Sequence, residues 1–166
     1  MSAVPDIYLG IGDLHFCAAP ARIRTVLGSC ISITLWHPVR RVGGMCHFML
    51  PGRNRRPEQA LDGRYGDEAM AIFDQEMARY GTRPADYRAK VFGGGNMFPD
   101  RPQTGPKLDV GQRNIEVTHR LLAERGIRII AEHLGGDGHR KLIFDVSNGN
   151  AWMAFQDAGE PTRRRK

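Results

Sequence analysis

Two stretches of the chain repeat apolar side chains at helical spacing, and they limit the folds that it can adopt. Residues 66–81 carry acids early and Arg79 late, and Gly81 supplies a stop. Residues 110–126 repeat the pattern, with Glu116 and Arg120 spaced as an i,i+4 pair and a closing glycine. The sequence therefore predicts two main helices, whose Met and aromatic positions belong to the core.

The other patterned segments are typical of β-strands. Alternating, β-branched residues 31–36 predict a strand that pairs as a hairpin with residues 42–50, and a short helix beginning at Cys30 is the alternative for so short a run. We also expect an early strand and turn in 7–16 and strands over 88–92, 127–134 and 140–146. The last two strands are expected to form a hairpin joined by GGDGH. A turn at 148–152 is expected to lead into a last short strand. This order predicts an α/β (α+β) sandwich with mixed, partly antiparallel β-sheets, and not repeated βαβ units.

Length and composition indicate one globular domain. The chain has 166 residues, with 41% hydrophobic and 25% charged residues. We expect a single domain over residues 1–160 and a basic, disordered tail over 161–166. No apolar run approaches the roughly 20 residues of a membrane span, and the N-terminus does not have the form of a signal peptide. The expected location is the cytoplasm, where the three cysteines would be reduced thiols.

The net charge of +6 does not predict a nucleic-acid partner. Four of the positive charges belong to the tail run RRRK, so the rest of the chain has a net charge of only +2. A second basic cluster, Arg53, Arg55 and Arg56, lies in a Pro/Gly-rich loop. That loop is either a docking surface or a plain solvated loop.

The chemistry-bearing residues are a cysteine and a histidine, each set beside glycines. Cys30 ends the segment LGSC, and His47 follows seventeen positions later in GGMCHFMLP. A thiol is a useful nucleophile as the thiolate, and a neighbouring imidazole is the usual way to generate one near neutral pH. On spacing alone, a lone Cys and a lone His are more often structural. Cys46 adjoins His47, so their side chains point to opposite faces of a strand, which favours Cys30 as the partner of His47.

Other motifs do not predict a cofactor. The run GGGN over residues 93–96 lacks the endings of nucleotide-binding loops, so we expect a turn packed close to the active centre instead. No Cys/His quartet with zinc spacing is present, and His133 and His139 are expected to be surface loop histidines. Asp13 and His15 near Cys17 do not have the spacing of a second site. We expect no metal and no organic cofactor.

Taken together, the motifs resemble one family. LGSC, GGMCHFMLP, FGGGNMF, VGQRNIE, HLGGDGHRKLIFD and a final NG occur in the order found in the chemoreceptor glutamine deamidase (CheD) family, from about residue 7 to residue 150. The resemblance implies hydrolysis of the side-chain amide of selected Gln residues in the cytoplasmic domains of methyl-accepting chemotaxis receptors, giving Glu and ammonia. It also implies a fold similar to that of toxin-type cysteine deamidases.

The same resemblance assigns roles to residues. Cys30 matches the nucleophile, His47 the catalytic histidine, and Thr25 the third member, with Ser29 as the nearest other hydroxyl. Gly28 and Ser29 would support the turn and the oxyanion through backbone N–H groups. Some family members also bind a CheC-type phosphatase.

Other functions fit the same residues. A binding module would dock on receptors or on a phosphatase and act as an adaptor without catalysis. A Cys-His dyad also serves a transglutaminase, if an amine replaces water, or a methylesterase.

Overall fold

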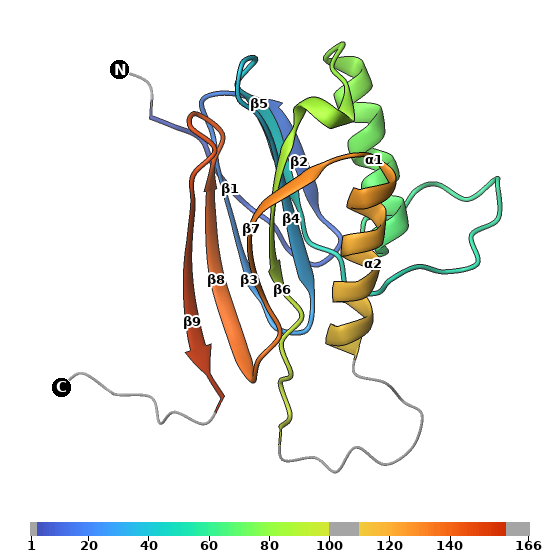
Figure 1. The fold of residues 1–166 in the computed structure, drawn as a ribbon, viewed down its shortest axis with the longest axis vertical. Helices are drawn as coiled ribbons and strands as arrows, with labels where there is room; N and C mark the ends of the chain where they lie inside the picture. The colour runs from blue at the N-terminus through green and yellow to red at the C-terminus, as the bar shows by residue number, and fades with distance from the viewer. Residues whose placement is uncertain (1–2, 100–109, 159–166) are drawn as a thin grey trace.

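The computed structural model describes residues 3–99 and 110–158, so the predicted tail over 161–166 and the domain limit at residue 160 lie outside the described residues. Within these ranges the chain forms three layers: a four-stranded sheet, a five-stranded sheet, and two helices that cover the far side of the five-stranded sheet (Figure 1). This arrangement confirms the predicted α/β sandwich with two main helices and mixed sheets.

The five-stranded sheet forms the middle layer. Its strand order is β2-β5-β4-β6-β7, antiparallel throughout except for the parallel pair β6–β7. The strands are β2 (Leu14–Ala18), β5 (Val42–Cys46), β4 (Ile31–His37), β6 (Arg88–Gly93) and β7 (Arg128–Leu134). The predicted hairpin of residues 31–36 with 42–50 is therefore confirmed as β4–β5.

The four-stranded sheet has the order β1-β3-β8-β9. Its members are β1 (Asp6–Tyr8), β3 (Arg22–Leu27), β8 (Gly138–Asp145) and β9 (Ala151–Asp157). β1 runs parallel to β3, and the other pairs are antiparallel. Along β3 the buried side chains Ile23, Thr25 and Leu27 alternate with more exposed ones, so one face of this sheet packs toward the other sheet.

Helices α1 (Gly66–Arg79) and α2 (Val110–Glu124) pack on the five-stranded sheet, and a 3₁₀ turn covers Pro84–Asp86. α1 begins with Asp67 and Glu68 in its first turn, where acids interact favourably with the helix dipole, and its end is followed by Gly81 in a left-handed conformation (φ +68°). Two apolar clusters result. One lies between the helices and the five-stranded sheet, and the other lies between the two sheets.

Two sequence predictions were wrong: His133 and His139 lie on strands β7 and β8, not in a loop, and the hairpin predicted across GGDGH does not form. The strands over 127–134 and 140–146 form, but GGDGH does not join them as a hairpin, because β7 pairs with β6 in one sheet and β8 pairs with β3 and β9 in the other. Gly135 and Gly136 both have positive φ, and residue 137 bridges to Asn96 as the chain crosses between the sheets. A glycine-rich run of this length serves a hairpin or a crossover equally well, so the sequence does not reveal the partner strand.

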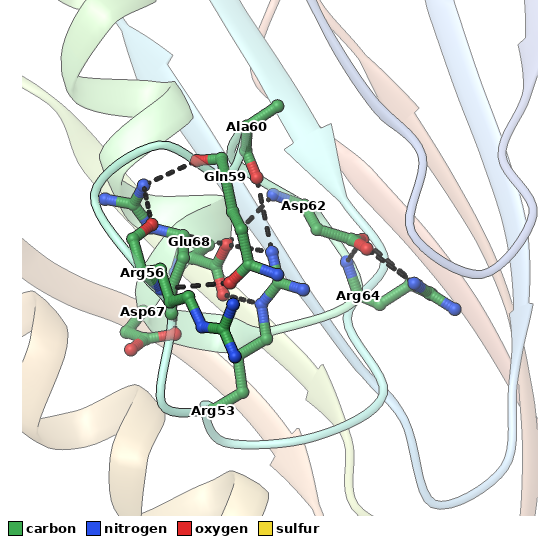
Figure 2. Close-up of polar contacts among 9 residues, drawn as sticks. Arg53, Arg56, Gln59, Ala60, Asp62, Arg64, Asp67 and Glu68 are labelled. Carbon is green, nitrogen blue, oxygen red and sulfur yellow. Dashed lines mark hydrogen bonds and ion pairs between the residues drawn. The ribbon is translucent and has the colours of Figure 1, made fainter.

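The loop after β5 is tied to α1 through one buried carboxylate. Arg53 donates from Nε and Nη2 to Glu68, at 3.0 Å each, and Arg55 lies 3.7 Å from the same carboxylate (Figure 2). The Asp62 N–H donates to it as well. Arg53 and Arg55 therefore hold the loop against the helix, while Arg55 and Arg56 stay exposed to solvent, so both the docking surface and the solvated loop stay open as predictions.

Candidate active site

The site begins with a hydrogen bond between the two sheets. Thr25 on β3 and His47, which directly follows β5, bring their side chains together, with Oγ1 of Thr25 lying 2.7 Å from Nδ1 of His47. Both side chains are buried, with relative exposures of 6% and 4%. The bond places the imidazole at the seam between the layers.

A second contact of Thr25 fixes the tautomer of His47. The Thr25 hydroxyl donates to the carbonyl oxygen of Leu9 at 2.9 Å, and a carbonyl can only accept. Because a hydroxyl has one proton, both contacts are satisfied together only when Thr25 donates to Leu9 and accepts from Nδ1, and neutral His47 then carries its proton on Nδ1. Its Nε2 is left with a free lone pair, as a general base requires.

Cys30 lies on the same face of the five-stranded sheet as His47. Ile31 and Phe48 exchange two backbone hydrogen bonds, and this register sets Cys30 opposite Met49 and Ser32 opposite His47. Cys30 and His47 are then diagonal neighbours, a pairing whose Cα atoms usually lie about 7–8 Å apart. Within the described residues the Cys30 thiol makes no hydrogen bond to the imidazole.

Cys46 faces away from His47, as predicted. It belongs to the apolar cluster under the helices, whereas Cys30 belongs to the cluster between the sheets. Complete burial raises the pKa of the Cys46 thiol to about 12. Cys17, on β2, is a half-buried thiol whose pKa is also raised by burial. Cys17 and Cys30 thus both lie on the side of the five-stranded sheet that faces the other sheet, but Cys17 pairs with Gly43, four residues before His47, whereas Cys30 is the diagonal neighbour of His47.

The turn that carries Cys30 is held by its three carbonyl groups. The carbonyl of Gly28 accepts from the N–H of Gly95 at 3.0 Å, and that of Cys30 accepts from the N–H of Gly94 at 2.9 Å. The Ser29 carbonyl accepts from the side chain of Asn114 at 3.1 Å. The predicted packing of the GGGN turn against the Cys30 segment is thus confirmed.

The N–H groups of the same turn are available. Within residues 3–99 and 110–158, none of the backbone N–H groups of Gly28, Ser29 and Cys30 donates a hydrogen bond. Donors of this kind beside a nucleophile are what an oxyanion hole consists of. Gly28 and Ser29, which the sequence predicts to support an oxyanion, therefore have backbone N–H groups without a hydrogen-bond acceptor among the described residues.

Burial shifts the pKa values of the thiol and the imidazole in opposite directions. Desolvation raises the pKa of Cys30 and lowers that of His47, and the charge of Asp13 raises the latter by a smaller amount. Both shifts favour a neutral thiol beside a neutral imidazole at rest. An ion pair would require both groups to ionise against these shifts.

A cavity of about 410 Å³ reaches the imidazole. Thr25 and His47 line it, with exposed Tyr8, Ile11 and Val26 among the other lining residues. Cys30 is not among the described residues that line it. The cavity therefore gives access to the imidazole and to its Thr25 partner.

No group of three or more His, Cys, Asp or Glu side chains within the described residues is arranged to hold a metal ion. No helix among them is long and apolar enough to cross a membrane.

Sequence reasoning missed two partners in the site. The Leu9 carbonyl, which accepts from Thr25, carries no sequence signal. Asn114 does carry one, because an asparagine stands on the face of α2 that also buries Val117 and Leu121, a position where apolar residues are expected.

Comparison with known proteins identifies the family. The model of the CheD family, described as CheD chemotactic sensory transduction, matches residues 49–155. This chain belongs to the CheD family. The protein named "Probable chemoreceptor glutamine deamidase CheD 3" of Dechloromonas aromatica (strain RCB) is 49% identical over 164 residues, 96% of this chain and 95% of the relative.

Other CheD relatives are nearly as similar. "Probable chemoreceptor glutamine deamidase CheD 2" of Albidiferax ferrireducens (strain ATCC BAA-621 / DSM 15236 / T118) is 51% identical, covering 89% of this chain and 85% of the relative. Among solved structures, YlmD from Geobacillus stearothermophilus has a TM-score of 0.49 at 15% identity, covering 76% of this chain and 51% of that one. A likeness that low carries no argument about function.

Proposed function

We propose that this CheD-family protein is a chemoreceptor glutamine deamidase, which hydrolyses Gln side chains of receptor cytoplasmic domains to Glu and releases ammonia. The observation that carries the proposal is the Leu9–Thr25–His47 chain of hydrogen bonds, which leaves Nε2 of the imidazole free on the sheet face that bears Cys30. The names of the relatives, which share about half of their residues with this chain, supply the substrate class.

The first chemical step is attack by sulfur. His47 takes the Cys30 proton at Nε2, and the thiolate attacks the carboxamide carbon of the substrate Gln. Catalytic hydrogen bonds are often long in a free enzyme and tighten once substrate is bound. We therefore expect substrate binding to bring the thiol and Nε2 within hydrogen-bonding distance.

The second step expels ammonia. The negative charge that develops on the amide oxygen is stabilised by the N–H groups of the Gly28–Cys30 turn, and losing one such donor typically lowers kcat roughly 10²–10³-fold. His47 returns its proton to the leaving nitrogen, and the acyl group stays on Cys30 as a thioester. Water, deprotonated by the same imidazole, then hydrolyses the thioester and restores the thiol.

Thr25 acts in this scheme by orienting the imidazole. Its hydroxyl accepts from Nδ1 and keeps the lone pair on Nε2. Ser29, the alternative third member, lies in the Cys30 turn, and its hydroxyl makes no hydrogen bond to His47 within the described residues. These contacts support Thr25 for the role.

The partners follow from the reaction. The chemoreceptor is the substrate, and a CheC-type phosphatase is a second partner that the family resemblance suggests. The competing possibility is an adaptor that binds a receptor or phosphatase without catalysis. The ordered Thr25–His47 pair favours the enzyme, because an adaptor has no need of a fixed tautomer.

The test is mass spectrometry of a purified receptor cytoplasmic fragment incubated with the protein. Deamidation adds about 1 Da at specific Gln residues, because an amide becomes a carboxyl when the thioester is hydrolysed. Added methylamine distinguishes a transglutaminase, which would leave an amine adduct at the same residues. Loss of a methyl group from receptor Glu esters would indicate a methylesterase. An unmodified receptor that is retained in a pull-down would indicate the adaptor.

A further inference from the structure

Asn114 is a fully buried polar residue in the first half of α2, and its side chain leaves the helix to contact two other segments. Its Nδ2 group donates to the Ser29 carbonyl at 3.1 Å and to the Met49 carbonyl at 2.9 Å. Both partners are carbonyl oxygens, which only accept, so the amide orientation is fixed by its contacts.

The two carbonyls belong to the two segments that carry the reacting groups. Ser29 immediately precedes Cys30, and Met49 follows His47 by two residues. Met49 also lies opposite Cys30 in the β4–β5 register. One NH₂ group therefore connects the cysteine turn to the histidine segment and holds both against α2.

Burying an amide at this position costs free energy of folding. α2 buries apolar side chains around it, and the Oδ1 atom of Asn114 is buried with no hydrogen-bond partner among the described residues. A buried polar atom without a partner destabilises the folded state. Residues that break the local pattern in this way are expected at functional sites.

We propose that Asn114 is a positioning residue for the deamidation, which sets the distance between the Cys30 thiol and the His47 imidazole. This inference rests on the proposed function. It adds that α2, a helix outside the sandwich of sheets, aligns the nucleophile with its base. Asn114 acts through the backbone and does not touch the reacting atoms.

The main variant is Asn114→Asp, which keeps the size of the side chain and replaces the two N–H donors by a carboxyl that offers one O–H donor at most, so the two carbonyls can no longer be bonded together. Displacements of about 1 Å remote from the chemistry can lower rates about 100-fold, so we expect kcat to fall by about that factor while KM changes little. The matched control is Thr118→Val. Thr118 is also fully buried on α2, but its hydroxyl donates only to the Asn114 carbonyl within the helix, so its variant should retain the wild-type kcat.

A second readout needs no receptor. The rate at which iodoacetamide alkylates Cys30 is followed by peptide mass at several pH values. This rate measures how well His47 assists deprotonation of the thiol. Asn114→Asp should slow alkylation of Cys30 at neutral pH and move the profile to higher pH, while buried Cys46 stays unmodified. A loosened fold would do the opposite, with faster alkylation of both cysteines.

The two measurements distinguish a positioning role of Asn114 from a merely structural one. A lower kcat with slower Cys30 alkylation supports positioning. Wild-type kcat and alkylation in Asn114→Asp, or faster alkylation of both cysteines, overturns it. If Asn114→Asp does not fold, Asn114→Ala is assayed in the same way. If the wild type deamidates no receptor fragment, the proposed function fails, and the alkylation profiles still decide the role of Asn114.

Discussion

Replacing Thr25 by valine removes one hydroxyl from the site and keeps the shape of the side chain. Two hydrogen bonds disappear: the one from Thr25 to the Leu9 carbonyl and the one from His47 Nδ1 to Thr25. Without an acceptor at Nδ1, the imidazole is free to carry its proton on Nε2. That tautomer presents a proton to Cys30 where a lone pair is required.

The magnitude follows from the burial of the groups that lose their partners. Leaving a buried donor unpaired costs about 1–3 kcal/mol, and His47 is 4% exposed. At about 1.4 kcal/mol per tenfold change in rate, this predicts that kcat/KM falls roughly 5- to 160-fold. The Leu9 carbonyl loses its donor as well, so the free energy of unfolding should fall by about 1–3 kcal/mol.

The assay is the initial rate of Glu formation in a receptor fragment, with urea unfolding measured in parallel. Thr34→Val is the matched control, because Thr34 is a buried strand threonine whose hydroxyl donates to the Lys90 carbonyl at 3.2 Å. It should lose stability without losing activity, and Thr25→Ser should recover most of the rate. Wild-type kcat/KM in Thr25→Val, at normal stability, would refute the role of Thr25.

Three more predictions follow from charge. Burial lowers the pKa of His47 and raises that of Cys30. The plateau of kcat/KM against pH should therefore extend below about 6.5 and above about 8.5, the ordinary pKa values of the two groups. A plateau confined between those two values would contradict a neutral thiol beside a neutral imidazole. Because the unfolded histidine binds a proton before the folded one, the free energy of unfolding should also decrease as the pH falls below about 6.5, in urea titrations at several pH values. Arg53→Ala should lower the urea midpoint of unfolding, because it removes two charge-assisted hydrogen bonds from buried Glu68. Arg56→Ala, at an exposed position, should change the midpoint little, and equal midpoints would show that the loop is not held by the Arg53–Glu68 pair.

The helices and strands with strong periodicity could be predicted from the sequence. The pairing of strands that are far apart in the chain could not. Both helices and the β4–β5 hairpin carry clear patterns and were found. The strand β3 was not predicted, although its six residues, RIRTVL, begin with the alternation typical of a half-buried strand. That strand supplies Thr25, so its position relative to His47 became visible only when the two sheets were placed face to face.

For the site, side-chain orientation along a strand could be predicted, but contacts between distant segments could not. The opposite orientations of Cys46 and His47 follow from strand periodicity alone and were correct. The Leu9 carbonyl and Asn114 join segments far apart in the chain, and their contacts depend on how three layers stack. No spacing in the sequence encodes such a contact.

The central claim is that Cys30 is the nucleophile of a glutamine deamidase. Its most direct test compares Cys30→Ala with Cys46→Ala in the receptor mass assay, because both remove a thiol from the segments around His47 but only Cys30 shares its face. Cys30→Ala is expected to give no mass gain at any receptor Gln, whereas Cys46→Ala retains the gain. Conversion of receptor Gln to Glu by Cys30→Ala at the wild-type rate would contradict it.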